Sequence, residues 1–274
     1  MLRNVRAEVL KQVRRPAHWL LLGVAVTLSL TFAYLVPYAG YAGGTSGPPN
    51  SDRGLAAMLP DQFVSNAIGG MPVFVGALSV IFGVLVAGSE YGWETWKAVF
   101  TQTHSRPTVY AAKVVTVAAG VLLLVVTLFA TSAAASAVVA SLESRPLSWP
   151  SAADVAVGVG SGWLITMMWA SLGIFLAVSF RSVALPIGLG LVWLLAVQNL
   201  LTAIAAPLLN WVAALQKGLP GPNAGSLVAS LGAPPDTPGV AALVGSTQAV
   251  VVVAAYLVVF TAVGGWLLYR RDIL

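Results

Sequence analysis

The sequence contains no cysteine and only two histidines, His18 and His104. Without cysteine the chain has no disulfide, no cysteine-based zinc or iron–sulfur site and no thiol nucleophile. The two histidines lie far apart in the sequence and outside any cluster with the spacing of metal ligands. We therefore predict no metal site in this chain.

Charged residues are also scarce, at 8% of the 274 residues, whereas 58% are hydrophobic and the mean hydropathy is +0.87. A soluble domain carries roughly 25% charged residues. Most side chains here cannot face water, and a span takes roughly 20 apolar residues. These numbers predict an all-α integral membrane protein with a single transmembrane domain over residues 1–274.

Long apolar runs give the predicted architecture, which is six transmembrane helices. We expect these spans at residues 19–39, 67–88, 113–140, 154–180, 183–204 and 243–268. The third and fourth runs exceed the thickness of the hydrocarbon core and should tilt or project from it.

The distribution of lysine and arginine predicts the orientation. With the N-terminus inside, eleven of these residues lie in inner segments, and only Arg53, Arg145 and Lys217 lie outside. Inner loops are enriched in positive charge, so both termini should be cytoplasmic and the protein should lie in the cell membrane. The net charge of +5 then reflects topology and anionic lipid headgroups rather than nucleic acid.

Residues 1–16 are predicted to form an amphipathic helix along the inner membrane surface. Leu2, Val9 and Val13 share one helical arc, and Pro16 allows a change of direction into the first span. A plain topogenic charge cluster is the alternative, and the two are compatible. The basic residues of this interface helix are Arg3, Arg6, Lys11, Arg14 and Arg15.

Residues 205–242 hold two short apolar stretches, at about 207–215 and 224–231, separated by the turn-rich residues 219–223. Neither stretch is long enough to span a bilayer. We expect outer interfacial or re-entrant helices here, before the last span.

The middle of every predicted span lacks Asp, Glu, Lys, Arg and His. Ionisable groups inside a membrane mark proton and ion relays, so a proton-coupled carrier or a pump with its own relay is disfavoured. Gln198 and Asn199 are the most polar pair, and they could line a substrate path or hydrogen-bond a neighbouring helix. There is no phosphate-binding loop of the G-x-x-x-x-G-K-[ST] type and no Ser–His–Asp arrangement, so we expect no catalytic residues.

The segment 89–112, between the second and third predicted spans, carries the most distinctive pattern. Trp93, Trp96 and Phe100 recur at helical spacing, which predicts one aromatic stripe with exposed charges around it. Such a segment could be a membrane-lying linker or a docking element for a cytoplasmic protein, because large aromatics flanked by charges suit a protein contact. The pattern does not decide between the two.

Three short motifs follow one another along the chain. The first comprises Glu90, Thr95, Ser105, Arg106 and Lys113; the second is 219–224, with Pro220 and Asn223 in an outer turn; and the third comprises Trp266, Tyr269, Arg270, Arg271, Asp272 and Ile273. In this order the motifs resemble those of the type-2 permeases of ATP-binding-cassette (ABC) exporters, and the resemblance covers essentially the whole chain. In the first motif Glu94 and Thr95 stand where the family has Gly-Thr, and the proline before Ser-Arg is missing.

This resemblance implies a permease subunit that exports an amphipathic substrate such as a lipid, drug, peptide or antibiotic. ATP and magnesium would bind to a separate ATPase, present in two copies, and a second permease, identical or related, would complete the transporter. A coupling helix would contact the ATPase within 89–106, through Glu90, Tyr91, Trp93, Glu94, Thr95, Trp96, Lys97, Phe100, Ser105 and Arg106. The alternative is a membrane scaffold or sensor subunit without an ATPase.

Overall fold

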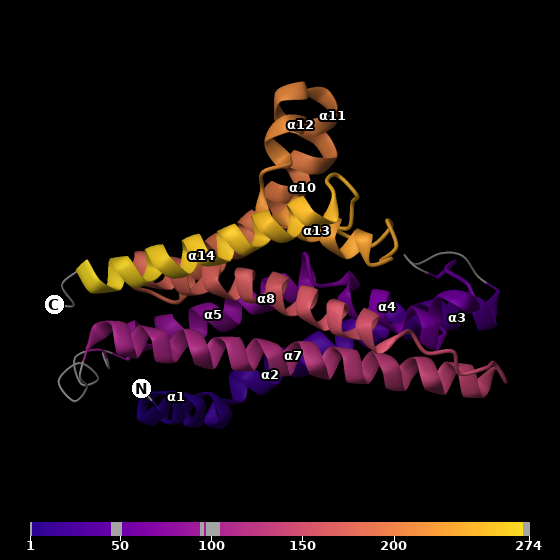
Figure 1. The fold of residues 1–274 in the computed structure, drawn as a ribbon, viewed down its shortest axis with the longest axis horizontal. Coiled ribbons are helices and arrows are strands. Elements are labelled where there is room, and N and C mark those ends of the chain that lie inside the picture. Colours follow the sequence, from indigo (N-terminus) through magenta and orange to yellow (C-terminus); the bar gives the residue numbers. More distant parts are fainter. Residues whose placement is uncertain (1, 45–50, 94–95, 97–104, 271–274) are drawn as a thin grey trace.

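The computed structural model describes residues 2–44, 51–93, 96 and 105–270, and these residues contain helices and no strand. The long helices run along a common direction (Figure 1). Both ends of the chain lie at the same end of this bundle, which we call the termini end; the opposite end is the far end.

Among the described residues, five helices are long and apolar enough to cross a membrane. The predicted spans 19–39, 113–140 and 154–180 each lie within one of them, and the predicted span 243–268 begins three residues before the last one. The five helices are the continuous run Pro16–Gly43 (α2 Pro16–Leu30, a π-helical stretch Thr31–Leu35 and α3 Val36–Gly43), α5 (Phe74–Gly92), α7 (Arg106–Leu142), α8 (Ala152–Phe180) and α14 (Ser246–Arg270).

The predicted span 67–88 is wrong at its start, because it joins parts of two helices. Residues 55–62 form two short 3₁₀ turns, Leu55–Met58 and Pro60–Gln62, and α4 covers Phe63–Gly69. A turn over residues 70–73 then separates α4 from α5. Pro72 lies in this turn, and its missing N–H and its effect on the preceding residue oppose a continuous helix.

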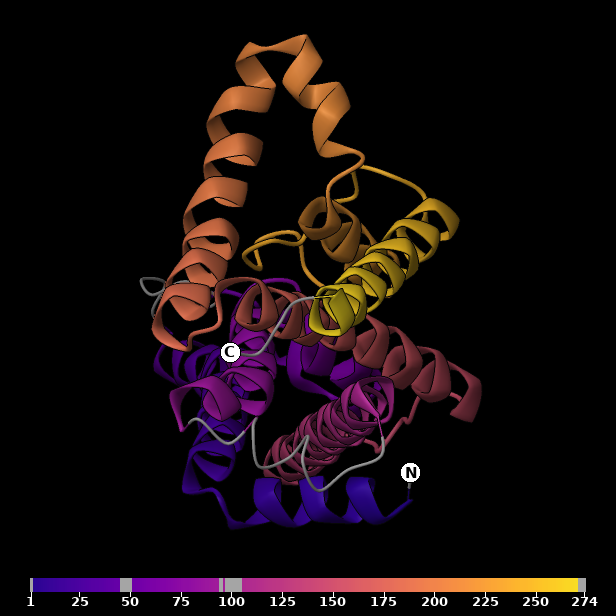
Figure 2. The ribbon, with the colours of Figure 1, turned by 90° about the vertical axis from the view of Figure 1, so that its left-hand side faces the viewer.

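The predicted span 183–204 corresponds to a shorter apolar helix, Ala184–Leu200, which is not among the five. Its start packs against α5 and α8, and it then leaves the bundle and returns through α12 (Figures 1 and 2). We call residues 184–216 the arm. The arm comprises α9 (Ala184–Leu191), a π-helical stretch (Val192–Val197), α10 (Gln198–Leu200), a second π-helical stretch (Leu201–Ala205), α11 (Ala206–Leu208) and α12 (Asn210–Gln216).

The predicted outer region 205–242 contains α12 and α13 (Pro220–Ser230), besides the three-residue α11. Residues 219–223 are not a separate turn, since Leu219 caps α13 and Pro220 is its first residue. Proline is favoured there because the first helical N–H has no partner in the helix. That the chain has six spans, and that these helices are re-entrant, remain predictions.

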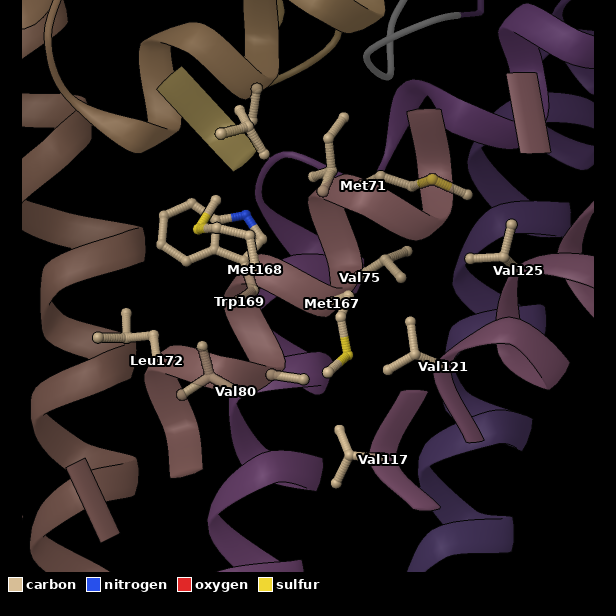
Figure 3. Packing of buried hydrophobic residues seen from close by; sticks show 14 of the residues in the cluster. Met71, Val75, Val80, Val117, Val121, Val125, Met167, Met168, Trp169 and Leu172 are labelled. Carbon is tan, nitrogen blue, oxygen red and sulfur yellow. The ribbon is translucent and has the colours of Figure 1, made fainter. Parts of the chain in front are cut away.

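The core lies where α5, α7 and α8 meet, around Met71, Val80, Val121 and Met168 (Figure 3). Glycines bring α5 and α8 into backbone contact. A Cβ atom added at Gly83 would collide with the carbonyl oxygen of Ala170, and one added at Gly173 with that of Val80. Small residues therefore let these two helices approach closely.

Candidate functional site at the termini end of the bundle

The predicted interface helix is α1 (Leu2–Arg14), which lies across the termini end and packs against α7 (Figure 2). Its apolar side chains Leu2, Leu10 and Val13 are exposed, whereas Glu8 and Gln12 are buried against the bundle. The apolar face of α1 is therefore available to a membrane, and its contact with the rest of the protein is polar.

The basic residues of α1 divide into two groups. Arg3, Arg6 and Arg14 are exposed, while Lys11 and Arg15 are partly buried. Arg15 has an extended backbone and separates α1 from α2, so the chain changes direction there, before Pro16. The interface residues that sequence analysis grouped together thus face different surroundings.

Four charged residues from three helices form a cluster at this end, which we call the charge cluster: Glu8, Lys11, Glu90 and Lys113. The Lys113 ammonium lies 2.9 Å from the Glu90 carboxylate and 3.1 Å from that of Glu8. Lys11 lies 3.0 Å from each of the same two carboxylates. Two cations and two anions therefore compensate one another where α1, α5 and α7 meet.

Burial makes this compensation important. The side chains of Glu90 and Lys113 are 2% and 1% exposed. Removing such ions from water is costly, and only close opposite charges and hydrogen bonds offset that cost. Lys113 also donates to the carbonyl oxygen of Val86 at 3.3 Å. Burial lowers the pKa of Lys11, but Glu8 and Glu90 outweigh it and raise that pKa above its ordinary value.

Arg15 ties the bend between α1 and α2 to the end of α5. Its guanidinium donates to the Ser89 hydroxyl at 2.8 Å and to the Leu85 carbonyl oxygen at 3.3 Å. It also lies 4.6 Å from the centre of the Trp93 ring. Cation–π contacts form at such distances. Arg15 therefore holds the end of α5 to the bend, and Lys11 holds it to α1 through Glu90.

The predicted coupling loop 89–112 is shorter in the structure. Glu90 and Tyr91 belong to the last turn of α5, and Arg106 begins α7 after the N-cap Ser105. The exposed position expected for Glu90 is wrong, because the charge cluster buries it. Glu94, Thr95, Lys97 and Phe100 lie outside the described residues.

The predicted aromatic stripe is also wrong for its two described members. Trp93 is a turn residue after α5 and is 64% exposed, whereas Trp96 is 2% exposed. The Trp96 ring lies 5.5 Å from that of Tyr91 and 5.3 Å from the Lys113 ammonium. Trp96 thus belongs with the charge cluster, and Trp93 remains as the exposed aromatic residue.

Two of the sequence motifs meet at the termini end. Arg106, which begins α7, donates to the carbonyl oxygen of Tyr269 near the end of α14 at 3.2 Å. The residues are 163 positions apart, so no local sequence pattern could have indicated this contact. It holds the last helix against the start of α7.

Gln198 and Asn199, the predicted polar pair, lie on α10. Gln198 is 6% exposed and packs against Gly221 of α13, where a Cβ atom would collide with its amide. Asn199 donates to the Leu195 carbonyl oxygen at 2.8 Å. Both residues line a cavity of about 140 Å³ together with Pro222. Gln198 thus packs against another helix, and a substrate path stays a prediction.

The predicted outer-turn residues Pro220 and Asn223 are both buried in α13. The Asn223 amide donates to the carbonyl oxygens of Lys217 at 2.8 Å and Leu219 at 2.7 Å. Asn223 therefore fixes the approach of the chain to α13.

A family model described as ABC-2 family transporter protein matches residues 4–198, more than two thirds of the chain. The match covers most of α1, all of α5 and α7, and all four residues of the charge cluster. No curated protein matches the chain. The family match and the long apolar helices together make this chain a multi-pass membrane protein, and it belongs to the ABC-2 family of transporter proteins.

Proposed function

We propose that this membrane component of an ABC transporter is the permease subunit of an ATP-driven exporter. A separate ATPase, in two copies, binds ATP and magnesium and contacts the termini end. A second permease, identical or related, completes the transporter. The exported substrate is an amphipathic molecule, and the protein lies in the cell membrane.

The charge cluster is the observation that carries this proposal. It joins α1, α5 and α7 at the point where residues 93–105 connect α5 to α7. A displacement of that connection acts directly on the last turn of α5 and the first turns of α7. Through Glu8 and Lys11 the same displacement reaches α1. An ATPase bound there has a direct mechanical connection to three helices.

The charges at the termini end also indicate how the protein is oriented in the membrane. The termini end carries exposed Arg3, Arg6 and Arg14, so we place it in the cytoplasm. The helical part of the arm before α12, residues 184–208, is about 37 Å long at the helical rise, which is enough for a sixth crossing. In this proposal α12 and α13 are the outer re-entrant helices.

Trp93 gives the sharpest test of the ATPase contact, because a large exposed aromatic side chain is typical of binding hot spots. Trp93→Ala should weaken recovery of the ATPase by about tenfold when the complex is purified in mild detergent. Trp211→Ala is the matched control, since Trp211 on α12 is exposed to a similar extent, 66% against 64%. Equal recovery with both variants would show that Trp93 has no part in docking.

Coupling to ATP is tested separately, with the reconstituted complex in liposomes. We expect substrate export to require hydrolysable ATP. Uphill transport by the permease alone, without nucleotide, would contradict the proposal. If no ATP-binding subunit co-purifies with the intact protein, the membrane scaffold or sensor function becomes the better account.

A further inference from the structure

Two cavities lie along the same pair of helices, α2 and α5. The first, of about 220 Å³, lies toward the termini end between α1, α2, α5 and α7. The second, of about 270 Å³, lies toward the far end between α2, α4, α5 and residues 234–238. Leu78 of α5 lines both cavities, so they meet at this side chain. We call the two together the α2–α5 groove.

The groove is long, apolar in its middle and open at its side. It follows the first span from His18 to Phe32, 14 positions or about 21 Å at the helical rise. Its middle is lined by Leu22, Leu28 and Leu78. Phe32 is 44% exposed at its edge. An apolar chain in the surrounding bilayer therefore has direct access to it.

Polar groups without a partner lie at the end of the groove nearest the termini. Gln12 is 8% exposed, and neither atom of its amide has a hydrogen-bond partner among the described residues. The His18 Nδ1 lies 3.2 Å from the Gln12 carbonyl oxygen, so in the neutral ring Nδ1 carries the proton and Nε2 accepts. Nε2 likewise has no partner within the described chain.

Unsatisfied buried polar groups are rare because each loses its hydrogen bonds to water without a replacement. Gln12 and His18 together offer one donor group and two acceptors to a molecule in the first cavity. The surrounding walls are apolar. The occupant that satisfies these atoms therefore needs both a donor and an acceptor on a small head group.

The second cavity, toward the far end, also presents a hydrogen-bond donor and acceptors. Arg53, Asn66 and Asp236 line it, and Arg53 donates to the Asn66 side-chain oxygen at 3.1 Å. Burial lowers the pKa of Arg53, while the negative charge of Asp236 acts in the opposite direction. This end thus holds a half-buried cation with an acidic group on the same cavity wall.

We propose that the α2–α5 groove binds a membrane phospholipid whose head group carries an ammonium and a phosphate, as in phosphatidylethanolamine. The phosphate accepts from the Gln12 amide or the Arg53 guanidinium, and the ammonium donates to His18 Nε2 or Asp236. An acyl chain lies along Leu22 and Leu78. Movement of this lipid between the two ends rests on the proposed transport function; binding does not.

The test uses purified permease in phosphatidylcholine nanodiscs that contain a small fraction of phosphatidylethanolamine with a photoreactive acyl chain. After illumination, adducts are mapped by peptide mass spectrometry. We expect adducts concentrated on Leu22, Leu28, Leu78 and Phe82. The same photoreactive chain on phosphatidylcholine, whose quaternary ammonium has no N–H, should label these positions about tenfold less.

A bulky side chain at the junction tests whether the groove is continuous. Leu78→Trp should abolish labelling at Leu22 and Leu28. Ile81→Trp is the matched control, since Ile81 is also partly exposed on α5 but lines neither cavity. In Ile81→Trp the labelling of Leu22 and Leu28 should match that of the unchanged protein.

Gln12→Leu supplies a test that does not depend on steric blocking. It should raise the thermal stability of the delipidated protein, because an unsatisfied amide is removed. It should also lower labelling by the phosphatidylethanolamine probe about tenfold. A merely structural glutamine would give neither this increase nor this loss.

Even labelling of exposed apolar residues on all helices, unchanged by Leu78→Trp, would mean ordinary surrounding lipid only and would overturn the proposal. Equal labelling by the two head groups, or full labelling of Gln12→Leu, would overturn the head-group assignment. Neither ATP nor an ATPase enters this experiment, so its failure is distinct from a failure of the proposed exporter function.

Discussion

The two ends of the bundle are held together by different chemistry. At the termini end, full charges of Glu8, Lys11, Glu90 and Lys113 pair in a buried site. Toward the far end, hydrogen bonds between neutral groups connect several helices, and the charged Arg53 and Glu143 bond to the neutral partners Asn66 and Tyr38. The Tyr34 hydroxyl lies 2.6 Å from that of Ser132, which donates to the Phe63 carbonyl oxygen at 3.0 Å, and Asn223 donates to two backbone carbonyls.

This difference has an energetic meaning. Loss of one partner from a buried ion pair leaves an uncompensated charge, whereas loss of a neutral hydrogen bond leaves only a dipole. The termini end should therefore be much more sensitive to single substitutions than the far end. The protein buries its charges at the end to which we assign the ATPase contact.

The largest effect is expected for Lys113→Met. This change leaves Glu8 and Glu90 with one cation between them, so it should lower the free energy of unfolding by about 3–5 kcal/mol. Lys217→Met, at an exposed lysine, should change it by less than about 0.5 kcal/mol. Denaturant unfolding in detergent, followed by circular dichroism, gives both values.

A second substitution sharpens this result. Glu90→Gln in the Lys113→Met background removes the excess negative charge and leaves Glu8 paired with Lys11. Stability should then rise again relative to Lys113→Met alone. A further loss of stability would show that the charges are not compensating one another.

Asn223→Ala should have an intermediate effect. It removes two hydrogen bonds to the carbonyl oxygens of Lys217 and Leu219 from a fully buried site, and should cost about 1–3 kcal/mol. Asn199→Ala removes one hydrogen bond to Leu195 from an exposed side chain and serves as the control. The same unfolding measurement applies, and equal losses would contradict the role given to Asn223.

Tyr34→Phe should have a smaller effect, about 1 kcal/mol. Ser132 keeps its hydrogen bond to Phe63, so no group loses every partner. Tyr41→Phe, at an exposed tyrosine, should be close to neutral. A loss as large as that of Lys113→Met would remove the contrast between the two ends.

The smallest effect concerns alkaline pH. The pKa of Lys11 is raised above 10.5, so its contribution to stability is complete below that pH and is lost as the pH rises through the folded pKa. The unchanged protein should therefore lose more thermal stability than Lys11→Met between about pH 8 and about pH 11. Equal losses of thermal stability in the two proteins would show that the charge cluster does not stabilise the protonated form of Lys11. Other titrating groups are common to both proteins.

The boundaries of the fourth predicted span agree well with the structure, because local signals mark both ends of that apolar run. Ser151 and Asp154 form a reciprocal cap at the start of α8, and Arg181 ends the same helix with a left-handed backbone. The prediction of 154–180 is therefore close to Ala152–Phe180. Apolar periodicity likewise indicated α1. The error at 67–88 arose because the apolar run continues through Pro72, so hydropathy alone hid the turn.

The site could be predicted only in part, because its contacts are distant in sequence. Glu8 and Lys113 are 105 positions apart, and nothing local indicates that they meet. Polarity led us to place Glu90 at the surface, whereas the paired lysines allow it to be buried. Trp93 and Trp96 have helical spacing, but α5 ends at Gly92 and Trp93 is a turn residue, so the spacing does not place them on one helical face.

Backbone contact at Gly83 and Gly173 limits how the molecule can change shape. No layer of side chains separates α5 from α8 at these points, so neither helix can turn about its own axis without lifting away from the other. The pair must move as one rigid unit. An opening of the bundle would keep this pair together and divide the bundle elsewhere, at incompletely filled seams such as that between α2 and α5.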